Sequence, residues 1–266
     1  MLPGYLKKFI HSTSGDIIKQ ICQPLARINI SFFLFVRDYK NGQRIWVTTH
    51  GDWTERFYIE SLYKHSAFEC PATIYTPGHY LWSTLPGQNV FAMAREFNID
   101  HGITMVTAYP EYYEFFHFGT TPDNPQILNF YINHRNVLEK FMAYFKDTAS
   151  DLIKKLEKVP ILVPYPTRHE KKQILVPNSE INVCDFLTEI ERERHYLKND
   201  NEDVYLTKRE AECLKLCLNG KTLERIADTL GISDRTVEAH IDHVKEKLDC
   251  YKQFQLGYKL AKSGFV

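Results

Sequence analysis

The stretch SDRTVEAHIDHVKEKL at residues 233–248 has the clearest chemical pattern in this chain of 266 residues. An apolar stripe with helical spacing predicts the buried face of a helix, formed by Val237, Ile241, Val244 and Leu248. The opposite face carries Arg235, Glu238, Ala239, Asp242, His243 and Glu246. Hydrogen-bonding side chains on one helix face are suited to reading base edges in the DNA major groove. Carboxylates on such a face are unexpected, because they repel phosphate.

Short helices with clear start and stop signals surround this stretch. TKRE at 207–210 has the spacing of a capping box. Thr222 and Ser233 can cap a second and a third helix, and the tight LGIS turn at 230–233 joins these two. A fourth helix is predicted over 252–264. Two short helices joined by such a turn indicate a helix-turn-helix motif.

Three other spacings suggest other chemistry, and each has a simpler explanation. Cys213 and Cys217 replace aliphatic residues on the buried face of a helix and are interpreted as small core residues. His240 and His243 would need two more ligands to hold a metal ion, so they are interpreted as DNA-facing or surface histidines. The Gly-Lys-Thr at 220–222 lacks the upstream glycine of a phosphate-binding loop and follows a helix. We therefore expect no metal ion and no cofactor.

The composition excludes several classes of protein. The chain has 33 basic and 33 acidic residues, so any attraction to nucleic acid must be local. Six cysteines without a CxxC pair indicate reduced thiols. The longest purely apolar run, 32–36, is far too short to span a membrane, and the N-terminus lacks an apolar signal segment. No nucleophile elbow, HExxH motif or paired-carboxylate spacing is present, so we expect that the protein is not an enzyme. The reduced thiols and the lack of a membrane or signal segment predict a cytoplasmic protein.

Three segments are predicted along the chain. Residues 1–158 combine a hairpin around Asn41-Gly42 and two more strands over 102–119 with helices that include 53–65 and 88–99. One long helix is predicted from Asn124-Pro125 to about residue 157. Residues 159–203 are rich in proline and are interpreted as a long connector with one possible helix over 182–197.

Residues 206–248 resemble the C-terminal DNA-binding domain of LuxR-type transcription regulators. The matching positions are Leu206, Thr207, Arg209, Glu210, Leu214, Gly220, Ile226, Ala227, Leu230, Gly231, Ile232, Ser233, Thr236, Val237, His240, Lys247 and Leu248. The resemblance implies a four-helix domain at 204–266 whose third helix enters the major groove of double-stranded DNA. It also implies backbone contacts from Lys221, Thr222, Arg235, Thr236 and Lys247, with Glu238, Ala239, Asp242 and His243 facing the bases.

The N-terminal part is similar to the autoinducer-binding domain of the quorum-sensing branch of that family. The resemblance implies a sensor and dimerisation domain with a small-molecule pocket that includes Trp53, Tyr58 and Trp82. In the family an aspartate accepts a hydrogen bond from the amide of an acyl-homoserine lactone, and in this register Ala67 occupies its position. A buried amide without an acceptor costs about 1–3 kcal/mol, so a different small apolar signal, or none, is expected. The same aromatic residues could also be ordinary core.

The predicted fold class is α+β. It consists of an N-terminal α/β/α sandwich around a mainly antiparallel sheet and a C-terminal all-α four-helix helix-turn-helix domain. Two functions remain open. The first is a homodimeric transcription regulator that responds to a small molecule. The second is an antagonist that pairs with other LuxR-type subunits and binds DNA poorly, which the acidic face of 233–248 favours.

Overall fold

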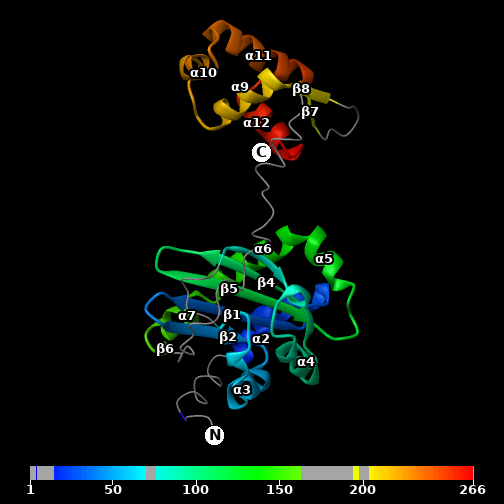
Figure 1. Cartoon of the computed structure of the whole chain (residues 1–266), viewed down its shortest axis with the longest axis vertical. Coiled ribbons are helices and arrows are strands. Elements are labelled where there is room, and N and C mark those ends of the chain that lie inside the picture. Colours follow the sequence, from blue (N-terminus) through cyan, green and yellow to red (C-terminus); the bar gives the residue numbers. More distant parts are fainter. Residues whose placement is uncertain (1–3, 5–14, 70–75, 163–193, 198–203, 266) are drawn as a thin grey trace. The chain divides into compact units, whose positions relative to one another are not determined.

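The computed structural model describes residues 4, 15–69, 76–162, 194–197 and 204–265. The chain forms two compact units, Met1–Ser179 and Glu180–Val266. Each unit has its own hydrophobic core. The predicted α+β class is confirmed, with an antiparallel sheet between helices in the first unit and a helical second unit (Figure 1).

A six-stranded antiparallel sheet is the centre of the first unit. Its order is β3-β4-β5-β1-β2-β6. The strands are β1 (Phe32–Tyr39), β2 (Gln43–Thr48), β3 (Gly78–Leu81), β4 (Asp100–Ala108), β5 (Tyr112–Thr120) and β6 (Ile161–Leu162). The predicted β1–β2 hairpin is confirmed, and the two strands predicted over 102–119 are β4 and β5, which pair antiparallel. Gly42 has a φ of 86°, a left-handed conformation that suits glycine in the first of these turns.

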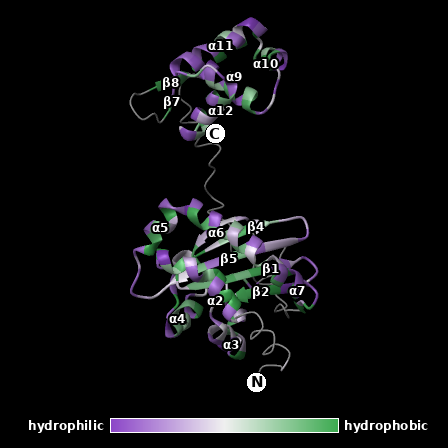
Figure 2. Ribbon diagram, turned by 180° about the vertical axis from the view of Figure 1, so that it is seen from behind, coloured by the Kyte–Doolittle hydropathy of each residue, from purple (hydrophilic) through white to green (hydrophobic). Residues whose placement is uncertain are grey.

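The two faces of the sheet carry different side chains, because neighbouring residues of a strand point in opposite directions. Phe33 and Phe35 of β1 face the helix α6 (Arg135–Thr148), and their rings contact Phe145 at centroid distances of 4.8 and 5.4 Å. Phe32, Leu34 and Val36 therefore face the other side, where α3 and α4 lie. Figure 2 shows hydrophobic residues along β1 and β2.

Helices cover both faces of the sheet. These elements are α2 (Asp16–Cys22), η1 (Gln23–Ile28), α3 (Gly51–Ile59), η2 (Leu62–Lys64), η4 (Trp82–Thr84), α4 (Gln88–Ala94) and η5 (Arg95–Phe97). The predicted helices over 53–65 and 88–99 thus each consist of an α-helix followed by a short 3₁₀ segment.

The prediction of one long helix over 124–157 was wrong. Three helices occupy this range: α5 (Ile127–Asn133), α6 and α7 (Ser150–Glu157). His134, with φ −125° and ψ 33°, separates the first two, and Ala149 separates the last two. The Asn124 side chain donates to Thr120 Oγ1 rather than capping a helix. Each of the three helices buries apolar residues in the core of the first unit.

The second unit contains the four predicted helices and a hairpin that the sequence did not indicate. The helices are α9 (Lys208–Leu218), α10 (Leu223–Leu230), α11 (Asp234–Lys247) and α12 (Gln253–Lys262). The strand β7 (Arg194–Leu197) pairs with β8 (Val204–Thr207). The helix predicted over 182–197 is therefore wrong at its last four residues, and its remainder lies outside the described residues. Side-chain caps are confirmed at Thr207, Thr222 and Ser233.

Candidate functional site

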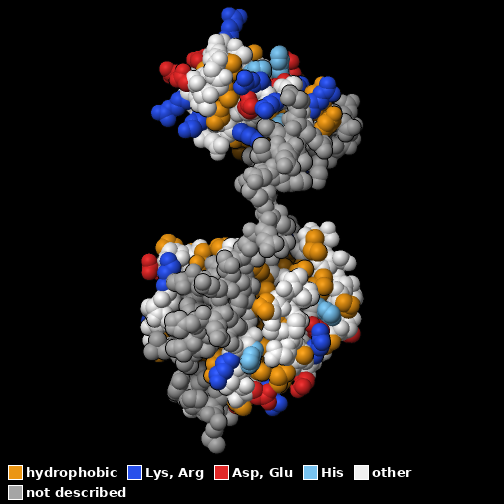
Figure 3. Space-filling model, viewed as in Figure 1, with side chains coloured by type: hydrophobic (Ala, Val, Ile, Leu, Met, Phe, Trp, Pro, Cys, Tyr) orange, Lys and Arg blue, Asp and Glu red, His pale blue; other side chains and the backbone are white. Residues whose placement is uncertain are grey.

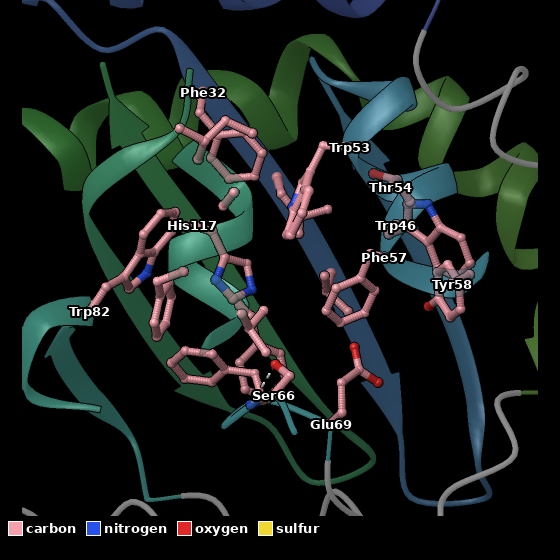
Figure 4. Close-up of a pocket in the computed structure, with 18 of the residues that line it drawn as sticks. Phe32, Trp46, Trp53, Thr54, Phe57, Tyr58, Ser66, Glu69, Trp82 and His117 are labelled. Carbon is pink, nitrogen blue, oxygen red and sulfur yellow. Dashed lines mark hydrogen bonds between the residues drawn. The ribbon is translucent and has the colours of Figure 1, made fainter. Parts of the chain in front are cut away.

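A cavity of about 100 Å³ lies in the first unit between the sheet and the helices α3 and α4 (Figure 4). Most of its walls are apolar or aromatic. The lining residues are Phe32, Leu34, Val36, Arg44, Trp46, Trp53, Thr54, Phe57, Tyr58, Ser66, Phe68, Glu69, Trp82, Val90, Phe91, Ala94, Ile99, Phe115 and His117. A mostly apolar cavity with a few polar groups is the usual form of a small-molecule site.

Strand register places the polar groups of this cavity. Residue 34 of β1 lies opposite His117 of β5, and His117 also lies opposite Thr104 of β4. Asp38 lies opposite Arg44 across the β1–β2 hairpin. Residues directly opposite in an antiparallel pair share one face, so all of these side chains are on the cavity side of the sheet.

The first polar group is a chain of hydrogen bonds from Trp82 to His117. Trp82 Nε1 donates to Thr104 Oγ1 at 2.8 Å, and Thr104 Oγ1 lies 2.8 Å from His117 Nδ1. When the Thr104 hydroxyl donates its own proton to His117 Nδ1, the neutral imidazole carries its proton on Nε2. Burial, with a smaller effect of Arg44, lowers the pKa of His117 to about 3, so the ring is neutral at physiological pH.

The second polar group is a buried ion cluster at the end of the hairpin. Arg44 donates to both carboxylate oxygens of Asp38, with Nη2 2.6 Å from Oδ2, and its Nη1 donates to Glu69 Oε2. Burial alone would lower the pKa of Arg44, but the charges of Asp38 and Glu69 outweigh burial and raise it. Burial raises the pKa of Glu69, and Arg44 opposes that shift. Two carboxylates therefore share one guanidinium.

The structure brings three of the four predicted pocket residues to this cavity. Trp53, Tyr58 and Trp82 line it, whereas Ala67 is buried outside the lining, between Ser66 and Phe68, which do line it. Tyr58 and Trp82 lie on opposite sides of the cavity, so they do not form one polar end (Figure 4).

Sequence reasoning missed Arg44 and His117 as pocket residues. Both lie on strands, and the only available signal was strand alternation in register with the apolar residues of β1. Glu69, two residues after Ala67, also lines the cavity.

The ring of Trp82 rests directly on the backbone of β4. A Cβ placed on Gly102 would lie 2.3 Å from Trp82 Cδ2, and one on Gly119 would lie 3.1 Å from Cη2. Phe91 stacks on the other side of the indole, with ring centroids 5.3 Å apart. The indole is thus held between a glycine and an aromatic side chain.

The second candidate site is the outward face of the helix-turn-helix. Val237, Ile241, Val244 and Leu248 are buried, as predicted. The six residues of the opposite face, Arg235, Glu238, Ala239, Asp242, His243 and Glu246, are all exposed, and so is Thr236. Lys221 and Thr222 are exposed at the start of α10. Figure 3 shows Lys and Arg side chains on the visible face of this unit, with Asp and Glu side chains among them. Asp242 Oδ1 accepts from Lys245 Nζ at 2.8 Å.

Lys247 differs from the other predicted DNA contacts. Its Nζ lies 2.8 and 2.6 Å from the two carboxylate oxygens of Glu210 and 5.3 Å from the ring centroid of Tyr205. The ammonium is therefore engaged within the unit, where it joins α11 to the start of α9.

Among the residues that the structure describes, no three His, Cys, Asp or Glu side chains lie close enough together to hold a metal ion. None of the helices in the described ranges has the length and apolar character needed to cross a membrane.

The sequence comparisons with known proteins each cover part of the chain. A family model described as "Bacterial regulatory proteins, luxR family" matches residues 204–257. The spore germination protein GerE of Bacillus subtilis is 39% identical over 59 residues, which are 22% of this chain and 80% of that protein. The transcriptional activator protein AhyR of Aeromonas hydrophila is 39% identical over 70 residues. That match covers 26% of this chain and 27% of the activator.

Two solved structures are similar at low identity. Escherichia coli SdiA aligns with 98% of this chain and 95% of its own, at 16% identity and a TM-score of 0.38. CepR2 from Burkholderia cenocepacia, described as an N-acylhomoserine lactone dependent LuxR family transcription factor, aligns with 56% of this chain and 97% of its own. Its identity is 14% and its TM-score is 0.37.

Proposed function

The chain belongs to the luxR family of bacterial regulatory proteins, and from this membership we propose that it regulates transcription by binding double-stranded DNA. The observation that carries the proposal is the exposed face of α11. The opposite face of this helix is buried, and its N-terminus is capped by Ser233. Helix N-termini at Thr222 and Ser233 offer backbone amides to phosphate, and Arg235 and Lys221 offer positive charge beside them.

The first unit is proposed to sense a small, mainly apolar molecule. Support comes from the enclosed aromatic cavity and from the polar groups that face it, which a purely structural core does not need. This molecule is the signal to which the regulator responds.

The regulator is further proposed to act as a homodimer. Readers of helix-turn-helix type match two-fold symmetric DNA with two-fold symmetry of their own. Around α12 the aromatic side chains of Tyr251, Phe254 and Tyr258 are 86%, 87% and 66% exposed, which favours burial against a second copy. Sedimentation should give a dimer at micromolar concentration, and a monomer both with and without DNA would contradict this.

Selection from a random duplex library tests the main proposal. The purified full-length protein should enrich an inverted repeat whose half-sites are spaced by about one helical turn. Arg235→Ala should lower the affinity for all duplexes by a similar factor, because the expected partner of Arg235 is phosphate. A library without any enriched sequence would overturn the proposal.

The alternative is a protein-interaction module, and the acidic face of α11 favours it. In that case no duplex is selected, and the chain instead forms mixed dimers with another LuxR-type subunit. Co-expression of two differently tagged subunits, followed by pull-down, distinguishes the two functions.

A further inference from the structure

Two atoms at the cavity have unused hydrogen-bonding capacity. Glu69 Oε1 has no hydrogen-bond partner among the described residues, whereas Oε2 accepts from Arg44. His117 is 7% exposed, its Nδ1 is used by Thr104, and its Nε2 has no partner in the described ranges. Both residues line the cavity. Figure 4 shows His117 and Glu69 both directed toward the space enclosed by the aromatic side chains.

The charges at this wall do not balance. Arg44 uses Nε and Nη2 for Asp38 and reaches Glu69 with Nη1 alone. Asp38 therefore forms the stronger, bidentate interaction with Arg44. The guanidinium compensates the negative charge of Glu69 only in part. Among the described lining residues, Arg44 is the one cationic side chain, and it is already shared. A ligand that carries positive charge would complete the compensation.

The remaining walls suit an aromatic body. Trp53, Phe57 and Phe91 line the cavity, and Trp46 stacks on Tyr58 with ring centroids 5.5 Å apart. Aromatic rings also stabilise a nearby ammonium through their negative faces. A ligand with a flat ring and a short cationic arm fits both properties.

We propose that this cavity binds a small aromatic amine whose ammonium group donates to the Glu69 carboxylate. The inference rests on the proposed sensing function of the first unit and names the chemical class of its signal. A ligand of equal size with a carboxylate would place two like charges together in a buried site, which disfavours it.

A series of three indoles of nearly equal size tests the charge preference. Tryptamine is cationic, tryptophol is neutral and indole-3-acetate is anionic at neutral pH. Calorimetric titration of the full-length protein should rank their affinities in that order. The amine should bind at least about tenfold more tightly than the acetate, because its hydrogen bond to the Glu69 carboxylate joins two opposite charges. Equal or tighter binding of the acetate, or no binding of the amine at millimolar concentration, would overturn the proposal.

The variant Glu69→Gln assigns the preference to one residue. It should remove the advantage of tryptamine over tryptophol, because the amide carries no negative charge for the ammonium to compensate. Glu96→Gln is the matched control, because Glu96 is exposed on η5 outside the cavity lining. Circular dichroism shows whether each variant is folded. If Glu69→Gln does not fold, the charge-preserving Glu69→Asp should still prefer the amine over the acetate, and loss of that order in the folded variant would contradict the role of Glu69.

DNA selection separates this inference from the function on which it rests. Selection of a duplex together with failure of the amine to bind would reject the ligand class alone. Amine binding without selection of any duplex would reject the proposed function alone.

Discussion

Lys247 at the end of α11 lies 2.6 Å from a carboxylate oxygen of Glu210 in the first turn of α9, although 37 residues separate them. The same oxygen, Oε2, also accepts from the Thr207 amide at 2.8 Å and completes a capping box. The buried carboxylate of Glu210 thus helps to cap the N-terminus of α9. It also joins α9 to α11, which carries the candidate DNA-reading face. Stability of the second unit and placement of α11 are coupled through this group.

Glu210→Gln should lower the stability of α9, so that this helix unfolds locally more often. Burial alone raises the pKa of Glu210, but Lys247 and the Thr207 amide outweigh it and hold that pKa below its usual range. A lowered pKa in the folded state gives stability that is present above the unfolded value of about 4.3 and is lost as the pH falls through the folded value. We expect a loss of roughly 1–2 kcal/mol at pH 7, because a cap and a charge-assisted hydrogen bond both weaken. Hydrogen exchange of the α9 amides measures this loss.

Glu212→Gln is the control on the same helix. Glu212 pairs with Arg209 at 2.9 Å, and the Arg209 side chain is 55% exposed. Exposed pairs contribute little, so exchange should change by less than twofold, about 0.4 kcal/mol. Equal effects of the two substitutions at pH 7, or an effect of Glu210→Gln that persists below the folded pKa, would show that the buried ion pair does not stabilise α9.

Gly102→Ala should disturb the cavity through Trp82. The added methyl group would meet the indole at 2.3 Å, and Phe91 blocks the opposite side. We expect a destabilisation of about 1–3 kcal/mol, as in other overpacked cores. All three tryptophans lie in the first unit, so urea unfolding followed by tryptophan fluorescence reports on this unit. Gly119→Ala should cost less, since its methyl group would lie 3.1 Å from the ring. The reverse order would show that the backbone beneath the indole is free to move.

Local signals in the sequence were sufficient for much of the fold. The Asn41-Gly42 turn fixes the β1–β2 hairpin, because glycine adopts the positive φ that the turn requires. Thr222 and Ser233 cap α10 and α11 with their own side chains, so the boundaries of these helices depend on nearby residues alone. The buried stripe of α11 follows from helical spacing.

Tertiary effects determined what could not be predicted. The apolar spacing over 127–157 continues through His134 and Ala149, so periodicity alone does not reveal the two breaks. Residues 194–197 form a strand because β8 offers a partner, which is a non-local pairing. His117 faces the cavity rather than α6 only because of its register opposite residue 34, and a shift of one residue would reverse this.

Common acyl-homoserine lactones should raise the melting temperature little or not at all. In the register that the family resemblance predicts, Ala67 takes the place of the aspartate, and Ala67 lies outside the cavity lining. A lactone amide would then lack that acceptor, and the loss of about 1–3 kcal/mol lowers affinity by roughly one to two orders of magnitude. Differential scanning fluorimetry with lactones of several chain lengths measures the shift. A large stabilisation would contradict the expectation and would identify Glu69 as the substitute acceptor, which Glu69→Gln would then abolish.

Glu238 and Asp242 should lower the affinity for random DNA and increase the selectivity for particular sequences. Both are exposed on the outward face of α11, whose buried stripe and cap are intact. Carboxylates repel phosphate, but they can accept a hydrogen bond from the cytosine amino group. Changing both residues to lysine should therefore tighten binding to random duplexes and steepen its salt dependence, because more counterions are released on binding. Affinities for random and selected duplexes across a salt series measure both effects.

A charge-matched control separates this local effect from net charge. Glu96 and Glu111 are exposed in the first unit, and changing both to lysine alters the total charge equally. Because exposed charges act only over about 10 Å in 0.1 M salt, the control should leave the salt slope nearly unchanged. Circular dichroism should show the same helix content in all variants. If the Glu238 and Asp242 changes alter neither affinity nor slope, the outward face of α11 does not meet DNA, and the interaction module becomes the better explanation of this chain.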